Sequence, residues 1–155
     1  MASVRHIADF FIRLADATAG DVMTHLRLQK LVYYAQAWSL AIRDKPLFPD
    51  VFQAWPHGPV SPALWSKFKT YGFNPIPVSA ATTDEAGIPA DEKNFLAEVW
   101  RAYGDFTAKK LEDITHSEEP WIAARGNLPP AAKSDAEIKP AAMKRFYKSK
   151  LGKKG

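Results

Sequence analysis

The chain has 155 residues, of which 46% are hydrophobic and 12% aromatic. That length and composition support one folded domain with a substantial core, and they exclude an intrinsically disordered chain. The sequence contains no cysteine, which excludes disulfides, thiolate metal sites and a cysteine nucleophile and is consistent with a reducing compartment.

The net charge of +4 is concentrated near the C-terminal end. Residues 134–155 carry seven Lys or Arg against two Asp or Glu, whereas residues 1–133 carry 14 against 15. We expect one domain at 1–147 and a basic, flexible tail at 148–155. Such a tail is usually only solvated, and weak contact with nucleic acid or an acidic partner is the alternative.

The sequence predicts a cytoplasmic protein without a membrane segment. Residues 31–42 form a charge-free stretch of 12 residues in a predicted helix, whereas a membrane span needs roughly 18 to 20 apolar residues. Arg5, His6 and Asp9 stand where a signal peptide requires its apolar core. We therefore expect neither a membrane anchor nor export.

The first 45 residues have helical periodicity. Apolar residues recur at spacings of three and four after Ser3, which predicts a capped helix that ends at or before Gly20. A second apolar stripe runs from Thr24 to Ile42, long enough for the central helix of a bundle. Pro46 follows the end of this second helix.

A short strand and a short helix are predicted next. Residues 51–55 are apolar and aromatic, so we expect a strand or extended segment with which residues 76–78 can pair. Ser61 followed by Pro62 predicts a helix start, with a stop near Gly72. Residues 79–90 form a polar loop that we expect to move.

Three further helix starts are predicted in the second half of the chain. Asp91 is expected to cap a helix that ends at Gly104, and Thr107 a shorter one. Ser117 is expected to cap a helix that holds Pro120 in its first turn.

The last helix is predicted to begin at Pro140, after an extended Ile138. A start at Ser134 would place that proline inside the helix, at a cost of about 3 kcal/mol. The sequence thus predicts a mainly α, compact domain of about six or seven helices with a small β-hairpin or extended pair.

Common catalytic and metal-binding motifs are absent from the sequence. It contains no P-loop, dinucleotide-binding turn, His-Glu-x-x-His pair or nucleophile elbow, and its four histidines lack metal-ligand spacing. Ser61 is better explained as a helix cap than as a nucleophile. We therefore expect no enzyme, no metal and no cofactor.

Two regions are candidates for binding a partner. Gln29, Lys30, Tyr33 and Gln36 lie away from much of the apolar stripe of the second helix, with Tyr34 on its margin. They form either a protein-binding face or an ordinary solvated face. The segment 55–59 holds two prolines and a glycine around His57. It either presents a rigid recognition loop or forms a buried corner.

Three blocks carry a resemblance to a known family. Residues 26–36 (LRLQKLVYYAQ) and 54–60 (AWPHGPV) resemble the two signature blocks of the Panacea domain, found in SocA-like antitoxins and phage-associated proteins. A third block, from Tyr103 to Arg125 and on to residues 138–147, is similar in order and spacing. The resemblance covers nearly the whole chain.

The resemblance implies an antitoxin that neutralises a cognate toxin by direct protein contact. SocA-type members are also associated with delivering the toxin to a Clp-type AAA+ protease. A nucleic-acid-binding regulator that uses the basic tail is the alternative function, and an enzyme that uses His57 and His116 is a remoter rival. On this basis we expect partner contacts, anchored by Trp55 and Tyr33, at Gln29, Lys30, Tyr33, Tyr34, Trp55, His57, Gly58, Trp65, His116 and Trp121.

Overall fold

The computed structural model describes residues 1–18 and 20–151, and these form seven α-helices and one three-stranded sheet. The predicted mainly α fold class is therefore confirmed. In chain order the elements are α1 Val4–Ala17, α2 His25–Trp38, β1 Phe52–Trp55, β2 Gly58–Val60, α3 Pro62–Phe68, α4 Ala90–Tyr103, α5 Ala108–His116, α6 Glu119–Arg125, β3 Glu137–Ile138 and α7 Pro140–Leu151.

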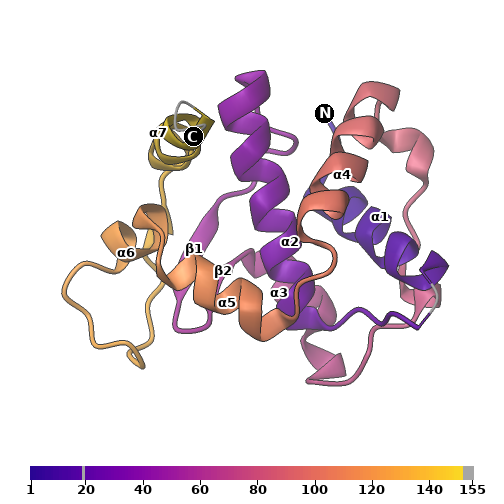
Figure 1. The fold of residues 1–155 in the computed structure, drawn as a ribbon. Helices are drawn as coiled ribbons and strands as arrows, with labels where there is room; N and C mark the ends of the chain where they lie inside the picture. The colour runs from indigo at the N-terminus through magenta and orange to yellow at the C-terminus, as the bar shows by residue number, and fades with distance from the viewer. Residues whose placement is uncertain (19, 152–155) are drawn as a thin grey trace.

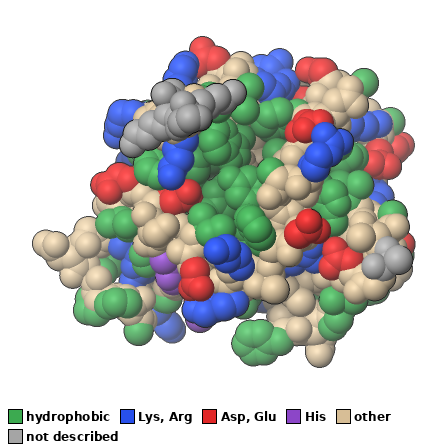
Figure 2. Space-filling model, in the orientation of Figure 1, with side chains coloured by type: hydrophobic (Ala, Val, Ile, Leu, Met, Phe, Trp, Pro, Cys, Tyr) green, Lys and Arg blue, Asp and Glu red, His purple; other side chains and the backbone are tan. Residues whose placement is uncertain are grey.

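Helix α2 occupies the centre of the domain (Figure 1). Helices α1 and α4 pack against one side of it, α7 against the other, and α5 and β2 against its first turns. A π-helical stretch, Ser39–Arg43, continues α2 before the chain turns. Figure 2 shows apolar side chains gathered at the centre of one face, over α2. Because neighbours surround it, α2 is buried almost all round, as expected of a central helix.

The small sheet has the order β2-β1-β3 with antiparallel pairing throughout. Trp55 is paired with Gly58 across a tight turn, and Phe52 is paired with Ile138. The predicted pairing of residues 76–78 with β1 is wrong, because Ile76 instead donates its N–H to the carbonyl of Met23. The local hairpin closes at little entropic cost and places β2 along one edge of β1. Strand β3 occupies the other edge.

Three of the predicted N-caps form as expected. The side chains of Ser3, Ser61 and Thr107 accept hydrogen bonds from backbone N–H groups in the first turns of α1, α3 and α5. Helix α7 begins at Pro140, as predicted, and buries Met143 and Tyr147. These starts depend on local sequence alone, which explains why they were predictable.

Two predicted N-caps are wrong. Helix α4 begins at Ala90 with Pro89 as its cap residue, so Asp91 lies inside its first turn. Helix α6 begins at Glu119 with Glu118 as its cap residue. Ser117 instead ends α5, where its hydroxyl donates to the carbonyl of Ile114.

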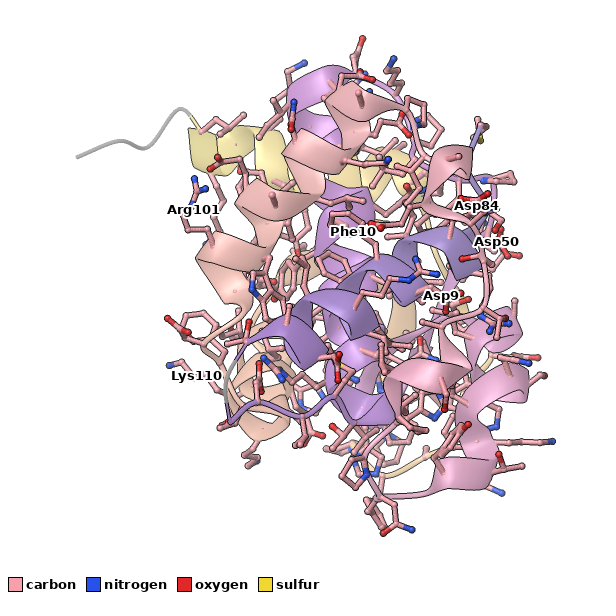
Figure 3. The ribbon with its side chains drawn as sticks, turned by 90° about the vertical axis from the view of Figure 1, so that its right-hand side faces the viewer. Asp9, Phe10, Asp50, Asp84, Arg101 and Lys110 are labelled. Atoms are coloured by element: carbon pink, nitrogen blue, oxygen red, sulfur yellow. The ribbon has the colours of Figure 1, made fainter. Side chains whose placement is uncertain are left out.

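The segment expected to be a polar loop contains two short 3₁₀ helices, Val78–Ala80 and Glu85–Gly87. Asp9 of α1 is fully buried and accepts hydrogen bonds from both the N–H and the hydroxyl of Thr83. Figure 3 shows Asp9 on the same side of the molecule as Asp84 in this segment. The segment is therefore attached to α1 by buried polar contacts.

The C-terminal helix extends beyond the expected domain end. Helix α7 continues to Leu151, four residues past position 147, and residues 152–155 lie outside the described part of the chain. Within 1–18 and 20–151, no helix has both the length and the apolar character needed to cross a bilayer.

Candidate functional site

The face of α2 that we expected to be exposed lies in the core. It is therefore neither a protein-binding face nor a solvated face. Gln29, Lys30, Tyr33 and Tyr34 each expose at most 1% of their surface. Neighbouring elements pack around α2 on every side, so its polar residues face other parts of the domain. None of these four side chains can touch a partner without a rearrangement of the core.

The two buried tyrosines of α2 belong to a hydrogen-bonded cluster that joins α2, α6 and α7. The hydroxyls of Tyr34 and Tyr147 both donate to the same carboxylate oxygen of Glu118 at 2.7 Å, and Tyr147 lies 3.2 Å from the hydroxyl of Tyr33. Burial raises the pKa of Glu118, and the two tyrosine donors oppose that rise. The predicted anchor Tyr33 is therefore a core residue.

Lys30 lies beneath the turn of the β1–β2 hairpin. Its amine is completely buried and makes no hydrogen bond to any described residue. Burial lowers its pKa to about 8, and the nearby carboxylate of Glu112 opposes the change. A Cβ at Gly58, whose φ is +113°, would lie 2.6 Å from Cε of Lys30. Glycine at this position therefore allows the hairpin to close over the lysine.

His57 is the exposed tip of the hairpin. Its side chain is 68% exposed, and Nδ1 lies 3.1 Å from a carboxylate oxygen of Glu112 on α5. The sequence left two interpretations of residues 55–59, an exposed recognition loop and a buried corner. His57 is exposed, as in the first, whereas Gly58 is buried, as in the second. The hairpin thus presents one polar ring to solvent beside α5.

His116 and Trp121 hold the hairpin from behind. Their rings stack at 4.2 Å, and the indole of Trp121 donates to the carbonyl of Trp55 at 2.8 Å. Arg125 lies over the same indole and donates to the carbonyl of Ala54. Trp121 exposes only 9% of its surface, so it is a buried residue that holds β1 in position.

Trp55, which is half-buried, and the more exposed Trp65 form the aromatic centre of the region. Their ring centroids are 5.1 Å apart in an edge-to-face arrangement, and Trp65 also stacks on His25 at 5.0 Å. Trp65 is 36% exposed and Phe73, in the loop after α3, is 87% exposed. We call Trp55, His57, Trp65, Lys69 and Phe73 the tryptophan surface.

Two hollows flank this pair of tryptophans. A pocket of about 310 Å³ is lined by both rings together with His25, Val60 and Phe73. A wider one of about 630 Å³ is lined by the same two rings and by Gln53, Pro56, Lys133, Ser134 and Asp135. The tryptophans are therefore a ridge between two mostly apolar depressions, a shape suited to receiving side chains of another molecule.

The ring of His25 is neutral in this environment. Its pKa is lowered to about 4, chiefly by burial and also by the positive charge of Lys30. A neutral ring stacks on Trp65 without placing a charge in the apolar pocket. Among the described residues, no group of three or more His, Asp or Glu side chains could hold a metal ion.

The structure brings only part of the predicted site together at the surface. Trp55, His57 and Trp65 meet on the tryptophan surface, whereas the other predicted residues lie beneath or behind it. Sequence reasoning missed Phe73, His25 and Lys69. Phe73 had a detectable signal, because a large aromatic residue in the turn sequence Gly72-Phe73-Asn74-Pro75 has no helical periodicity to explain it.

Comparisons with known proteins agree on one family. The model of the antitoxin SocA-like Panacea domain matches residues 28–122. Antitoxin SocA of Caulobacter vibrioides (strain NA1000 / CB15N) is 38% identical over 125 residues. That match covers 73% of this chain and 66% of the relative, so the chain spans just under two thirds of the relative's length. No solved structure was found to match the chain.

Proposed function

Because this chain belongs to the SocA-like Panacea-domain family, we propose that it is an antitoxin that neutralises a cognate toxin by binding it directly in the cytoplasm. Two findings support the proposal: the family match, and the relative's name as an antitoxin. The proposed function requires a protein-binding surface and no catalytic step.

The tryptophan surface is the proposed toxin-binding site. Exposed aromatic side chains in a hollowed surface contribute most of the affinity in many protein interfaces, and tryptophan is the most enriched of them. Phe73 is 87% exposed and lines the smaller pocket, so a partner that covered its ring would gain the free energy of burying it. This exposed aromatic cluster is the single observation that carries the assignment.

The buried signature residues support this surface from below. Gln29 bonds the backbone of Ser61 at the start of α3, Lys30 lies under Gly58, and Trp121 bonds the carbonyl of Trp55. Each of these contacts fixes the hairpin or the helix that carries an exposed tryptophan. We therefore assign them a positioning role.

Co-expression with the product of the neighbouring gene tests the proposal. We expect the protein to restore growth and to co-purify with that product, and Trp65→Ala to lose both while remaining folded by circular dichroism. Ile122→Ala is the matched control, because Ile122 is an apolar residue of similar exposure, 40%, on α6. Loss of rescue by the control, or full rescue by Trp65→Ala, would contradict the proposed site.

The same assay distinguishes two ways of neutralising a toxin. Rescue with a stable complex in cells that lack Clp protease activity means that occlusion of the toxin is sufficient. Rescue that disappears in those cells means that the protein delivers its toxin to the protease.

Helix α7 favours a second candidate function, contact with nucleic acid. Arg145, Lys148 and Lys150 are exposed on it, Lys139 is exposed just before it, and Lys144 is paired with Asp44. Exposed cations bind phosphates through counterion release, so such binding must weaken steeply as salt rises. Retention of DNA that is unchanged by Lys148→Glu, or independent of salt, would exclude this role.

A further inference from the structure

The segment that supplies the tryptophan surface contains no acidic residue. No Asp or Glu occurs between Asp50 and Asp84, a span that includes the hairpin, α3 and Phe73. Two exposed lysines, Lys67 and Lys69, lie in the same span. Of the residues that line the two pockets, Asp135 is the single carboxylate, and it is accompanied by Lys133 and Lys69.

This charge distribution favours an acidic partner. His25 is neutral, and His57 lies against Glu112, so Lys69 is the one Lys, Arg, Asp or Glu among the residues that line the smaller pocket. A carboxylate of a bound molecule next to Lys69 would meet a cation without an opposing negative group in that pocket. Another cation in that position would be repelled.

The ridge also offers an unused hydrogen-bond donor. The indole N–H of Trp65 makes no hydrogen bond to any described residue, whereas the indole of Trp55 donates to Gln53 at 2.8 Å. In a helical partner the backbone carbonyls are already bonded within the helix, but in an extended segment they remain free to accept. Aromatic ridges with a free indole donor are suited to such extended segments.

We propose that the partner contributes an extended segment that crosses the Trp55–Trp65 ridge, placing an apolar side chain in each pocket and a carboxylate beside Lys69. A backbone carbonyl of that segment accepts the hydrogen bond of the Trp65 indole. This inference rests on the proposed function, because the partner is the toxin. It specifies the conformation and the charge of the part of the toxin that is recognised.

Short overlapping peptides that span the neighbouring gene's product test this inference. Peptide binding to the full-length protein is measured by tryptophan fluorescence and by calorimetry. We expect at least one peptide with apolar and acidic residues to bind, and roughly tenfold weaker binding to the Lys69→Glu variant, about 1.4 kcal/mol. Replacing the acidic residues of that peptide by lysine is expected to weaken binding to the native protein and to restore it to the variant.

Two matched variants separate the parts of the inference. Trp65→Phe keeps an aromatic ring but removes the indole donor, so we expect weaker peptide binding with unchanged thermal stability. Lys110→Glu makes the same charge change on α5, where Figure 3 shows Lys110 pointing away from the body, and it is expected to have no effect. Equal weakening by Lys110→Glu would overturn the assignment of the charge contact.

The outcomes also separate this inference from the proposed function. If the intact product co-purifies with the protein but none of its peptides binds, the extended segment is wrong and direct neutralisation stands. If neither the intact product nor any peptide binds, both are overturned.

Discussion

The side-chain amide of Gln29 makes two hydrogen bonds with the backbone of Ser61. The N–H of Ser61 donates to Oε1 at 2.8 Å, and Nε2 donates to the carbonyl of Ser61 at 3.3 Å. The same Nε2 lies 3.0 Å from Nε2 of His25. Because Ser61 fixes which end of the amide is the oxygen, the amide nitrogen donates to His25, and the imidazole nitrogen must accept in its neutral form.

Replacing Gln29 by leucine is expected to destabilise the fold. Gln29→Leu leaves the buried N–H of Ser61 without a partner, while the carbonyl of Ser61 still accepts the N–H of Trp65, so the change should cost about 1–3 kcal/mol of the free energy of unfolding. Urea denaturation measures this loss. Gln53→Leu is the control, because Gln53 is half-buried and accepts one hydrogen bond, from Trp55. A similar loss in both variants would show that the bonds to Ser61 have no special weight.

Acid is expected to weaken the fold through His25. The pKa of this ring is about 4 in the folded protein, below its ordinary value of 6.5, so between these values the unfolded chain binds the extra proton. Stability that is fully present above pH 6.5 should therefore be lost as the pH falls toward 4. Urea denaturation between pH 7 and pH 4.5 measures the loss. The His25→Phe variant should show a smaller loss over the same range, and an unchanged pH dependence would exclude His25 as its cause.

Replacing Lys30 by methionine is expected to stabilise the protein at neutral pH. The folded-state pKa of about 8 lies below the ordinary 10.5, a difference that corresponds to about 3 kcal/mol of destabilisation below pH 8. Methionine fills a similar volume without a charge. Native stability should also rise between pH 8 and 9.5, and in Lys30→Met this rise should disappear. A less stable variant would indicate that the amine has a favourable buried partner, such as water.

Two tryptophans of the predicted site are expected to respond differently to truncation. Trp121→Ala removes the stack with His116 and the bond to the carbonyl of Trp55, so we expect a loss of about 3–5 kcal/mol. Trp65→Ala should cost only about 1–2 kcal/mol, because Trp65 is partly exposed. Thermal and urea unfolding compare the two. Equal losses would place Trp65 in the core and remove it as a binding anchor.

Local sequence was sufficient to predict most of the helices. The cap at Ser61 with its following proline and the start at Pro140 each depend on a few adjacent residues, and the structure has both. The prediction at Ser117 failed by one position because two short helices share that junction, where the serine ends the first and Glu118 begins the second.

Pairing between distant segments was not predictable from the sequence. Residues 76–78 and Ile138 both offer an apolar, extended segment, and the first lies nearer to β1 in the sequence. The structure places Ile138 beside Phe52, since α7 packs along α2 and carries the preceding residues to the sheet. This pairing depends on where α7 packs in the folded domain, and no short stretch of sequence indicates that position.

The sequence by itself determined the fold class, the family and three residues of the candidate surface: Trp55, His57 and Trp65. Only the tertiary structure decided that Lys30, Tyr33 and Tyr34 are core and that Phe73 and Lys69 join the surface. The physical reason is that helical periodicity separates apolar from polar residues on an isolated helix. It cannot show that a central helix is enclosed on every side, with its polar groups bonded to neighbouring elements.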